Sequence, residues 1–516
     1  MEKNGERLVT EFESLWRLFL DAATDPQAGP IVYILDALDE CRQDDRDKII
    51  GRLQDFYIES TSQSSAGSRL KFLVTSRPYR QIELQFFQLT KHIPTTRLAG
   101  EEESNPISGE ISLVVKAKVA QLGEEIPLAG SVQSSLERRL LEIPNRTYLW
   151  LKLIWEEIRG ALTCKEKKLL KLIEQLPETV EQAYEQLLTK CNKKEHARRV
   201  LHIILAAHRP LTLSEMDVAL EIQVDSKSYE DLELEGDENR KIQIRTLCGL
   251  FVSIVDSRIY LIHQTAKEFL IRRNAEELES SGWRHSFDLQ TSHNVLAKIC
   301  ITHLCFDEFK GGPLSEVPNY FYGIDYEQKM ARFKRARFLK MFSDKHVFLG
   351  YSANYWITHF REAGKIAEDD LISLASKLCG IKRTPYPIWF EIFGDSNPDS
   401  AYAQDLDRNG QQWLPYGKKE PLPLYWAALH GLEEVVLFLL KNGPDVNAQG
   451  GYYGTALQAA AAGGYDKMVQ FLVQLDVDVY IQDRHYGTAL QAATAGGYDK
   501  MVQFLVQSDA DVNIQG

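Results

Sequence analysis

A block of sequence near the end of this chain is repeated with a spacing of 33 residues. Residues 453–482 and 486–515 are nearly identical, and a weaker copy begins one spacing earlier, at Pro423. A repeat of this length predicts a stack of similar small units, each of which buries its apolar face against the next. The two strong copies differ at Ala461/Thr494, Leu475/Ser508, Val477/Ala510 and Tyr480/Asn513.

Each copy has the same internal pattern. A Tyr-Gly-Thr-Ala-Leu segment starts it, Gly463-Gly464 closes a first helix, and an apolar helix over 468–473 is followed by a connecting finger at Asp478. This pattern resembles the ankyrin repeat. The resemblance implies a surface that binds a protein partner, not a catalytic centre. Because such repeats contact mainly their neighbours, we expect residues 1–400 to fold without them.

A second informative stretch lies near the start of the chain. The apolar run from Ile31 to Leu35 predicts a strand buried on both faces of a parallel sheet. Asp36, Asp39 and Glu40 follow it, at the edge where open α/β sheets bind ligands. Carboxylates there suit Mg²⁺. The alternative is a buried strand followed by the acidic first turn of a helix.

A second strand is predicted from Leu70 onward, ending in Thr75-Ser76-Arg77-Pro78. A charged helix over 44–57 and a polar loop over 60–68 separate the two strands, so the strands should pair in parallel. The guanidinium of Arg77 is suited to a phosphate group. The alternative is that Arg77 pairs with an acidic neighbour.

Together these segments resemble the Walker B and sensor 1 strands of NACHT-type signalling NTPases, which are P-loop NTPases of the STAND class. With the repeats, they resemble fungal-type NACHT–ankyrin proteins. By motif position, the resemblance implies that Asp36 holds Mg²⁺, that Asp39 and Glu40 are the catalytic carboxylates that position water, and that Arg77 senses the γ-phosphate.

The chain departs from that family in one respect, because it contains no G-x-x-x-x-G-K-[ST] motif. The backbone cradle and lysine that hold phosphate are therefore missing. Losing about three charge-assisted hydrogen bonds, each worth roughly 1.5–3 kcal/mol, removes on the order of three to six decades of affinity. We expect no nucleotide cofactor and no enzymatic activity for this chain, and Mg-ATP or Mg-GTP for a full-length protein. Either the chain is truncated, which we favour at both ends, or it is a degenerate paralogue.

The middle of the chain predicts helices, with a hairpin over 250–262 that resembles the winged-helix domain of these NTPases. We expect residues 226–239 to form an exposed or partly disordered acidic loop. Helix 213–222 has three acidic residues and no Lys or Arg, which argues against DNA binding. His263 packs toward the nucleotide domain in the family, but a helix-capping role is the alternative. Aromatic residues over 351–360 lie on one helix face and predict core packing or domain docking.

The expected fold is thus multidomain and mainly α with α/β parts. We divide it into a partial nucleotide-binding core with a P-loop NTPase-type parallel sheet, a helical domain, a winged-helix-like domain, a helical linker domain and an ankyrin solenoid. The stretch 395–420 reads as a linker or adapter. The domain boundaries are 1–95, 96–194, 195–275, 276–400 and 401–516.

Composition restricts the function classes. The net charge of −13 argues against nucleic-acid and anionic-membrane partners. The seven cysteines form no C-x-x-C pair, and no signal peptide or membrane span is evident, so we expect a cytoplasmic protein. One hypothesis is an NLR-like protein of innate-immunity type, with protein-binding repeats, a nucleotide-dependent switch and self-oligomerisation. The other is a non-enzymatic interaction scaffold.

Overall fold

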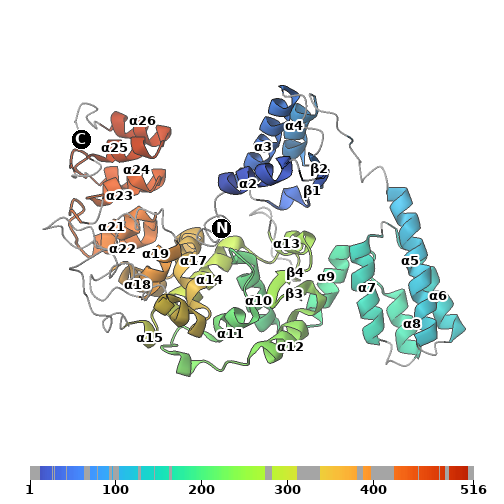
Figure 1. Cartoon of the computed structure of the whole chain (residues 1–516). Coiled ribbons are helices and arrows are strands. Elements are labelled where there is room, and N and C mark those ends of the chain that lie inside the picture. The colour runs from blue at the N-terminus through green and yellow to red at the C-terminus, as the bar shows by residue number, and fades with distance from the viewer. Residues whose placement is uncertain are drawn as a thin grey trace. The chain divides into compact units, whose positions relative to one another are not determined.

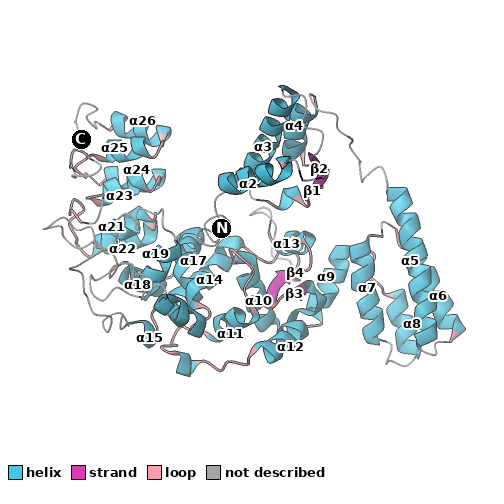
Figure 2. Ribbon diagram, viewed as in Figure 1, coloured by secondary structure: helices cyan, strands magenta, loops and turns pink. Residues whose placement is uncertain are grey.

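The fold is a series of mainly helical elements, seen in a computed structural model of the chain (Figures 1 and 2). The chain divides into two units, residues 1–113 and 114–516, which are described separately. The structure describes residues 12–25, 27, 29–41, 43–62, 70–77, 79–91, 96, 104–125, 129–144, 146–161, 166–272, 282–310, 337–380, 388–396, 423–450, 453–475, 477–482 and 487–508. Nearly all of the expected linker over 395–420 lies outside these ranges.

The first unit is a small α/β unit. Its elements are α2 (Phe12–Thr24), β1 (Ile31–Leu35), η1 (Leu38–Glu40), α3 (Gln43–Ser62), β2 (Leu70–Val74) and α4 (Arg80–Thr90). The strands pair in parallel from Ile31↔Leu70 to Leu35↔Val74, as predicted. Helix α3 runs to Ser62, beyond the predicted end at residue 57 and into the stretch predicted as a loop.

Only one face of this sheet is covered by described residues. The ring of Phe72 lies 6.1 Å from that of Phe19 on α2 and 5.9 Å from that of Phe56 on α3. Alternate residues point the other way, and Val32 and Ile34 are 61% and 60% exposed. The prediction of a strand buried on both faces is therefore wrong for the described part of the chain, because α2 and α3 both pack on the Phe72 side.

A helical region opens the second unit. It contains α5 (Ser104–Glu125, which begins in the first unit), α6 (Gly130–Glu142), α7 (Tyr148–Ala161) and α8 (Glu166–Glu174). Apolar residues spaced three and four apart, such as Val115, Val119 and Leu122 on α5, are buried. The buried Trp150 on α7 donates from its indole nitrogen to the Pro177 carbonyl at 2.9 Å, which ties α7 to the segment before the next helix.

The next region contains helices and the predicted hairpin. Its elements are α9 (Val180–Thr189), α10 (Lys194–Ala206), α11 (Leu213–Glu221), η2 (Tyr229–Asp231), α12 (Asp237–Cys248), η3 (Gly249–Phe251), β3 (Val252–Val255), β4 (Arg258–Leu261) and α13 (Gln264–Leu270). Strands β3 and β4 pair antiparallel. Asp256 and Ser257 join them with φ of 48° and 59°, which suits a type I′ turn.

The acidic segment 226–239 has a defined structure, and residues 233–239 are exposed, which confirms the exposed alternative of the prediction. Residues 237–239 belong to α12, and Tyr229 packs into the core, where its hydroxyl lies 2.7 Å from Nε2 of His303. The carboxylate of Asp231 accepts the backbone N–H groups of Lys227 and Ser228 at 2.7 Å and 3.0 Å. Local carboxylate–backbone bonds and one buried aromatic ring therefore outweigh the repulsion between the acidic side chains.

A helical region and the repeats complete the second unit. Within the helical region, the prediction of core packing over 351–360 is confirmed, since Tyr351, Trp356 and Phe360 are buried. The elements are α14 (Leu289–Leu304), α15 (Asp307–Lys310), α17 (Leu349–Ala363), η5 (Gly364–Ile366), α18 (Asp369–Cys379) and α19 (Ile388–Ser396). The repeat helices are α21 (Pro423–Leu429), α22 (Glu433–Lys441), α23 (Ala456–Ala462), α24 (Asp466–Val473), α25 (Ala489–Ala495) and α26 (Asp499–Gln507).

The repeats stack through their glycine turns. Gly431 and Gly464 have φ of +66° and +75°, and a Cβ on either would lie within 2.6 Å of a tyrosine ring from the following repeat. These rings belong to Tyr465 and Tyr498. Only glycine gives both the backbone conformation and the space for the ring. The Gln458 side chain also donates to the Gly487 carbonyl at 2.5 Å, across the repeat boundary.

The first repeat packs on the helical region as well as on its neighbour. The indole of Trp426 on α21 lies 5.0 Å from the ring of Phe390 on α19. Arg361 on α17 donates to the Tyr465 hydroxyl at 2.8 Å. The expectation that repeats contact mainly one another therefore holds for the second and third repeats better than for the first.

Candidate functional site

The predicted site residues lie where β1 and β2 end. Asp36 directly follows β1 and is exposed, while Ala37 has a left-handed backbone with φ of 53°. Backbone bonds join the two strand ends, since Thr75 N donates to the Leu35 carbonyl and Leu38 N donates to the Thr75 carbonyl, each at 2.9 Å. The structure thus brings together the two segments that the sequence placed at one sheet edge.

Thr75 fixes the orientation of Asp36. Its hydroxyl donates to Oδ1 of Asp36 and accepts the backbone N–H of Ala37 at 2.8 Å. One side chain therefore holds both the acidic residue and the strained residue after it. Sequence analysis assigned no role to Thr75. The only available signal was a hydroxyl residue at the end of the second strand.

Asp39 and Arg77 form a pair. The Asp39 side chain is 5% exposed, and its Oδ1 accepts the Arg77 backbone N–H at 3.1 Å. Its Oδ2 lies 3.5 Å from Nε of the Arg77 guanidinium. Arg77 also donates to the Tyr79 hydroxyl at 3.4 Å. This arrangement matches the alternative in which Arg77 pairs with an acidic neighbour.

The donor set at this edge fits Mg²⁺ only in part. Asp36 offers one exposed carboxylate, whereas Asp39 faces a guanidinium that competes with a cation. Glu40 is exposed in η1. Among the described residues, no group of three or more His, Cys, Asp or Glu side chains could hold a metal ion. The described side chains would therefore supply Mg²⁺ with fewer than three ligands, and its remaining ligands would have to be water or phosphate oxygens.

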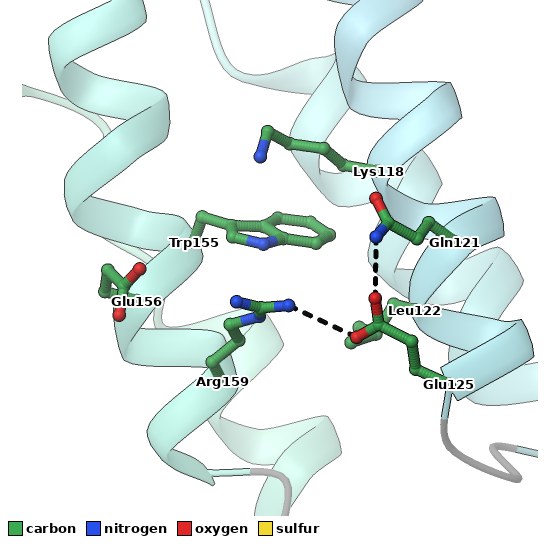
Figure 3. Close-up of a pocket in the computed structure, with 7 residues that line it drawn as sticks. All are labelled: Lys118, Gln121, Leu122, Glu125, Trp155, Glu156 and Arg159. Atoms are coloured by element: carbon green, nitrogen blue, oxygen red, sulfur yellow. Dashed lines mark hydrogen bonds and ion pairs between the residues drawn. The ribbon is translucent and has the colours of Figure 1, made fainter.

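A pocket of about 260 Å³ lies between α5 and α7 in the second unit and contains none of the predicted site residues (Figure 3). Lys118 Nζ lies 5.2 Å from the ring centroid of Trp155. Glu125 accepts from Gln121 at 2.6 Å and from Arg159 at 3.2 Å. These polar groups interact with one another. We therefore interpret them as contacts that join α5 to α7, and not as a ligand-binding site.

The residues singled out in the winged-helix-like region have structural roles. The Nδ1 atom of His263 accepts the Thr265 backbone N–H at 3.2 Å and caps α13, which supports the capping alternative. Glu215 and Asp217 on α11 are buried, where Glu215 pairs with Arg209 and Asp217 with Arg240. Both carboxylates are thus buried in ion pairs, and neither belongs to an acidic surface that would repel DNA.

Family comparisons agree with the order of these regions. Residues 1–77 match the N-terminal family of nephrocystin 3, and residues 107–165 match a domain family of unknown function. Residues 184–281 match the winged helix domain of GPI inositol-deacylase, and residues 424–516 match ankyrin repeats in three copies.

Two relatives add to this result. The chain is 25% identical over 279 residues to the vegetative incompatibility protein HET-E-1 of Podospora anserina, which covers 53% of this chain and 19% of the relative. These matches support the resemblance to fungal NACHT–ankyrin proteins that was drawn from Asp36–Glu40, Thr75–Pro78 and the repeats.

The second relative is the azaphilone pigments biosynthesis cluster protein L of Monascus ruber. It is 24% identical over 337 residues, which cover 61% of this chain and 62% of the relative. The chain thus spans less than two thirds of the length of either relative. Within the described ranges, none of the helices combines the length and apolar composition that a membrane-spanning helix needs.

Proposed function

We propose that this chain is an NLR-like signalling scaffold whose ankyrin repeats bind a protein partner. The observation that carries the proposal is the anchoring of the repeat stack to the helical region. Trp426 packs on Phe390, and Arg361 holds Tyr465 of the second repeat. A stack fixed at one end can pass the strain of a bound partner to the helices beneath it.

A groove at this junction supports the same proposal. It has a volume of about 650 Å³ and lies between the end of α17 and the glycine turns of the first two repeats. The Arg361 guanidinium lies in its lining, 5.5 Å from the Tyr465 ring centroid. A partner that shifts the second repeat would change this contact first.

Lysine crosslinking in a fungal cell extract, followed by mass spectrometry, tests the proposal. We expect crosslinks to other proteins at Lys441, Lys467 and Lys500, which are exposed on the repeats. Lys193 and Lys194 are exposed outside the repeats and serve as the control. Crosslinks that are no more frequent on the repeats than at the control lysines would contradict the proposal.

A second candidate function is a nucleotide-dependent switch at the edge that contains Asp36, Asp39, Glu40 and Arg77. Its supporting observation is the exposed carboxylate of Asp36, held in place by Thr75. In this proposal Mg-ATP or Mg-GTP binds there only when a G-x-x-x-x-G-K-[ST] motif is supplied from outside these 516 residues, Arg77 exchanges Asp39 for phosphate, and the altered core favours self-association. The whole chain is cytoplasmic in this scheme.

Melting temperatures measured with Mg-ATP and Mg-GTP test the switch. We expect no shift for this chain, because its sequence contains no G-x-x-x-x-G-K-[ST] motif to hold the phosphates. A saturable shift at micromolar nucleotide that Asp36→Asn removes would instead support a switch within these 516 residues.

A further inference from the structure

The second repeat differs from both of its neighbours at two exposed positions. Where it has Leu475, the first and third repeats have Asn442 and Ser508. Where it has Tyr480, they have Asn447 and Asn513. Leu475 is 42% exposed and Tyr480 is 48% exposed. The central repeat alone therefore presents apolar side chains to solvent at these positions.

The residue at the first position normally caps a helix. Asn442 donates from its side chain to the Phe438 carbonyl at 2.8 Å, and Ser508 donates to the Phe504 carbonyl at 2.9 Å. Both bonds satisfy a carbonyl in the last turn of the second helix of a repeat. The Leu475 side chain has no polar atom that could donate to the equivalent carbonyl at the end of α24. The second repeat thus lacks the side-chain hydrogen bond that both neighbouring repeats form at this position, and it exposes apolar surface there.

The residue at the second position normally joins neighbouring repeats. Oδ1 of Asn447 accepts the backbone N–H of Asp478 at 3.0 Å, which links the turns of the first and second repeats. Tyr480 occupies the equivalent position one repeat later, and its side chain has no amide oxygen to accept such a bond. Its own backbone is held by Asp478, whose Oδ1 accepts the Tyr480 N–H at 2.9 Å. The aromatic ring is therefore not needed to form the turn.

Packing does not explain these two side chains. Val477, which also differs between the two near-identical repeats, is 7% exposed and fills the interior. Leu475 and Tyr480 are on the same short connection but are 42% and 48% exposed. Residues that break local structural rules without a packing gain are expected at functional sites, and exposed aromatic residues are typical anchors of protein interfaces.

The charge around these residues indicates the kind of partner. Asp445 and Asp478 are exposed on the adjacent turns of the first and second repeats. Each carboxylate accepts one backbone N–H two residues later and keeps its negative charge at the surface. Two exposed carboxylates, on the turn of the exposed apolar residues and on the adjacent turn, complement a basic segment that carries an apolar side chain.

We infer that Leu475 and Tyr480 anchor the partner, and that the partner presents an apolar side chain flanked by Lys or Arg. The inference rests on the proposed protein-binding function. It narrows that function from the repeat stack as a whole to the connection after α24. It also predicts an unusual pair of effects, because replacing the anchors by the residues of the neighbouring repeats should weaken binding without weakening the fold.

A displayed library of random twelve-residue peptides, selected on the full-length chain, tests the inference. We expect selected peptides to combine Leu, Ile, Phe or Trp with Lys or Arg, and to bind less tightly at higher salt. Leu475→Asn and Tyr480→Asn should each weaken binding about tenfold, and the double variant about a hundredfold. Both should leave the melting temperature unchanged or higher. Val224→Asn, at a residue that is 75% exposed outside the repeats, is the matched control.

The outcomes separate the inference from the function on which it rests. Two outcomes would overturn the anchor and leave protein binding intact. In one, the selected peptides bind the double variant as tightly as the wild-type chain; in the other, the selected peptides are acidic. A lower melting temperature in both single variants would show a structural role and also overturn it. Failure to select any peptide on the wild-type chain would overturn the proposed protein binding, and the anchor with it.

Discussion

At the scale of single residues, Asp39 is the most informative side chain in the first unit. It is nearly buried and faces both the backbone N–H and the guanidinium of Arg77. Removing the charge of one partner in such a pair leaves the other without compensation. In this chain, the contact joins the segment after β1 to the segment after β2, so it stabilises the sheet edge whether or not nucleotide binds.

We therefore predict that Asp39→Asn destabilises the first unit by about 1.5–3 kcal/mol. Hydrogen exchange followed by mass spectrometry should show faster exchange, by at least about tenfold, in peptides that cover 31–41 and 70–77. Glu40→Gln is the control, because Glu40 is the exposed neighbour. Equal exchange in the two variants would mean that the Asp39–Arg77 pair contributes little.

The sequence predicted which segments meet at this edge but not how their side chains pair. An apolar run followed by acidic residues was enough to place Asp36, Asp39 and Glu40 together with Arg77. The role of Thr75 was not predictable, because its hydroxyl contacts Asp36 and Ala37 from a different strand. Such a contact depends on the strand register, which the sequence pattern does not determine.

At the scale of elements, helix α12 depends on a buried charge network. Arg240 is 2% exposed and donates from Nε to Asp217 at 2.7 Å and from Nη2 to Glu221 at 2.7 Å. Asp217 also accepts the backbone N–H of Gly236 at 2.9 Å, directly before α12 begins. The network thus positions the start of α12 and packs it on α11.

Arg240→Met should destabilise this region by about 3–5 kcal/mol, because it leaves the Asp217 carboxylate buried without its cation. Thermal unfolding monitored by circular dichroism would show the loss as a lower melting temperature. Lys241→Met is the control at the next position, where the ion pair with Glu238 is at 3.8 Å and the two side chains are 32% and 84% exposed. Asp217→Asn combined with Arg240→Met should recover part of the loss. If the double variant is no more stable than Arg240→Met, the buried charge is not the cause.

This network also explains why helix α12 was not predicted from the sequence. The β3–β4 hairpin follows from two β-rich runs and a two-residue turn, which are local signals. Helix α12 begins in a run of acidic residues that reads as an exposed loop. Asp217, Arg240 and Tyr229 hold that run in place through tertiary contacts to distant residues. Such contacts produce no periodic pattern in the sequence.

At the scale of the whole molecule, buried histidines predict a pH dependence for the second unit. Burial lowers the pKa of His202 to about 4, and burial with the nearby charge of His346 lowers that of His303 to about 3. The pKa of His359 is also held well below its usual value by burial. Both ring nitrogens of His303 form hydrogen bonds to neutral partners, Tyr229 and Ser352, and no carboxylate is among these partners to stabilise a protonated ring.

Stability should therefore fall as the pH falls below about 6.5. Above that value these histidines are neutral in both states and contribute no pH dependence. Below it the unfolded chain binds protons that the folded chain excludes, so each histidine costs about 1.4 kcal/mol per pH unit until the pH reaches its folded pKa. Melting temperatures at pH 7.5 and 5.5 measure the effect. His303→Asn should lower stability at pH 7.5 and reduce the pH slope, whereas a flat profile for the wild type would contradict the argument.

The last prediction concerns how much of the chain needs the repeats. The first repeat buries Trp426 against Phe390 and also packs α21 and α22 on α18. Burying one large aromatic side chain removes roughly 150–250 Å² from water, worth about 4–6 kcal/mol. The second and third repeats pack mainly on the repeat before them, apart from the bond from Arg361 to Tyr465.

A chain that ends at residue 420 should thus melt at a lower temperature than the full chain and bind a hydrophobic dye, because it exposes the surface that Trp426 covers. A chain that ends at residue 452 keeps α21 and α22, so it should retain most of the stability of the helical region. The difference between the two truncations measures the contribution of the first repeat. If both truncated chains unfold like the full chain, the first repeat is as independent as the sequence pattern alone suggested, and the anchoring that supports the signalling proposal is weak.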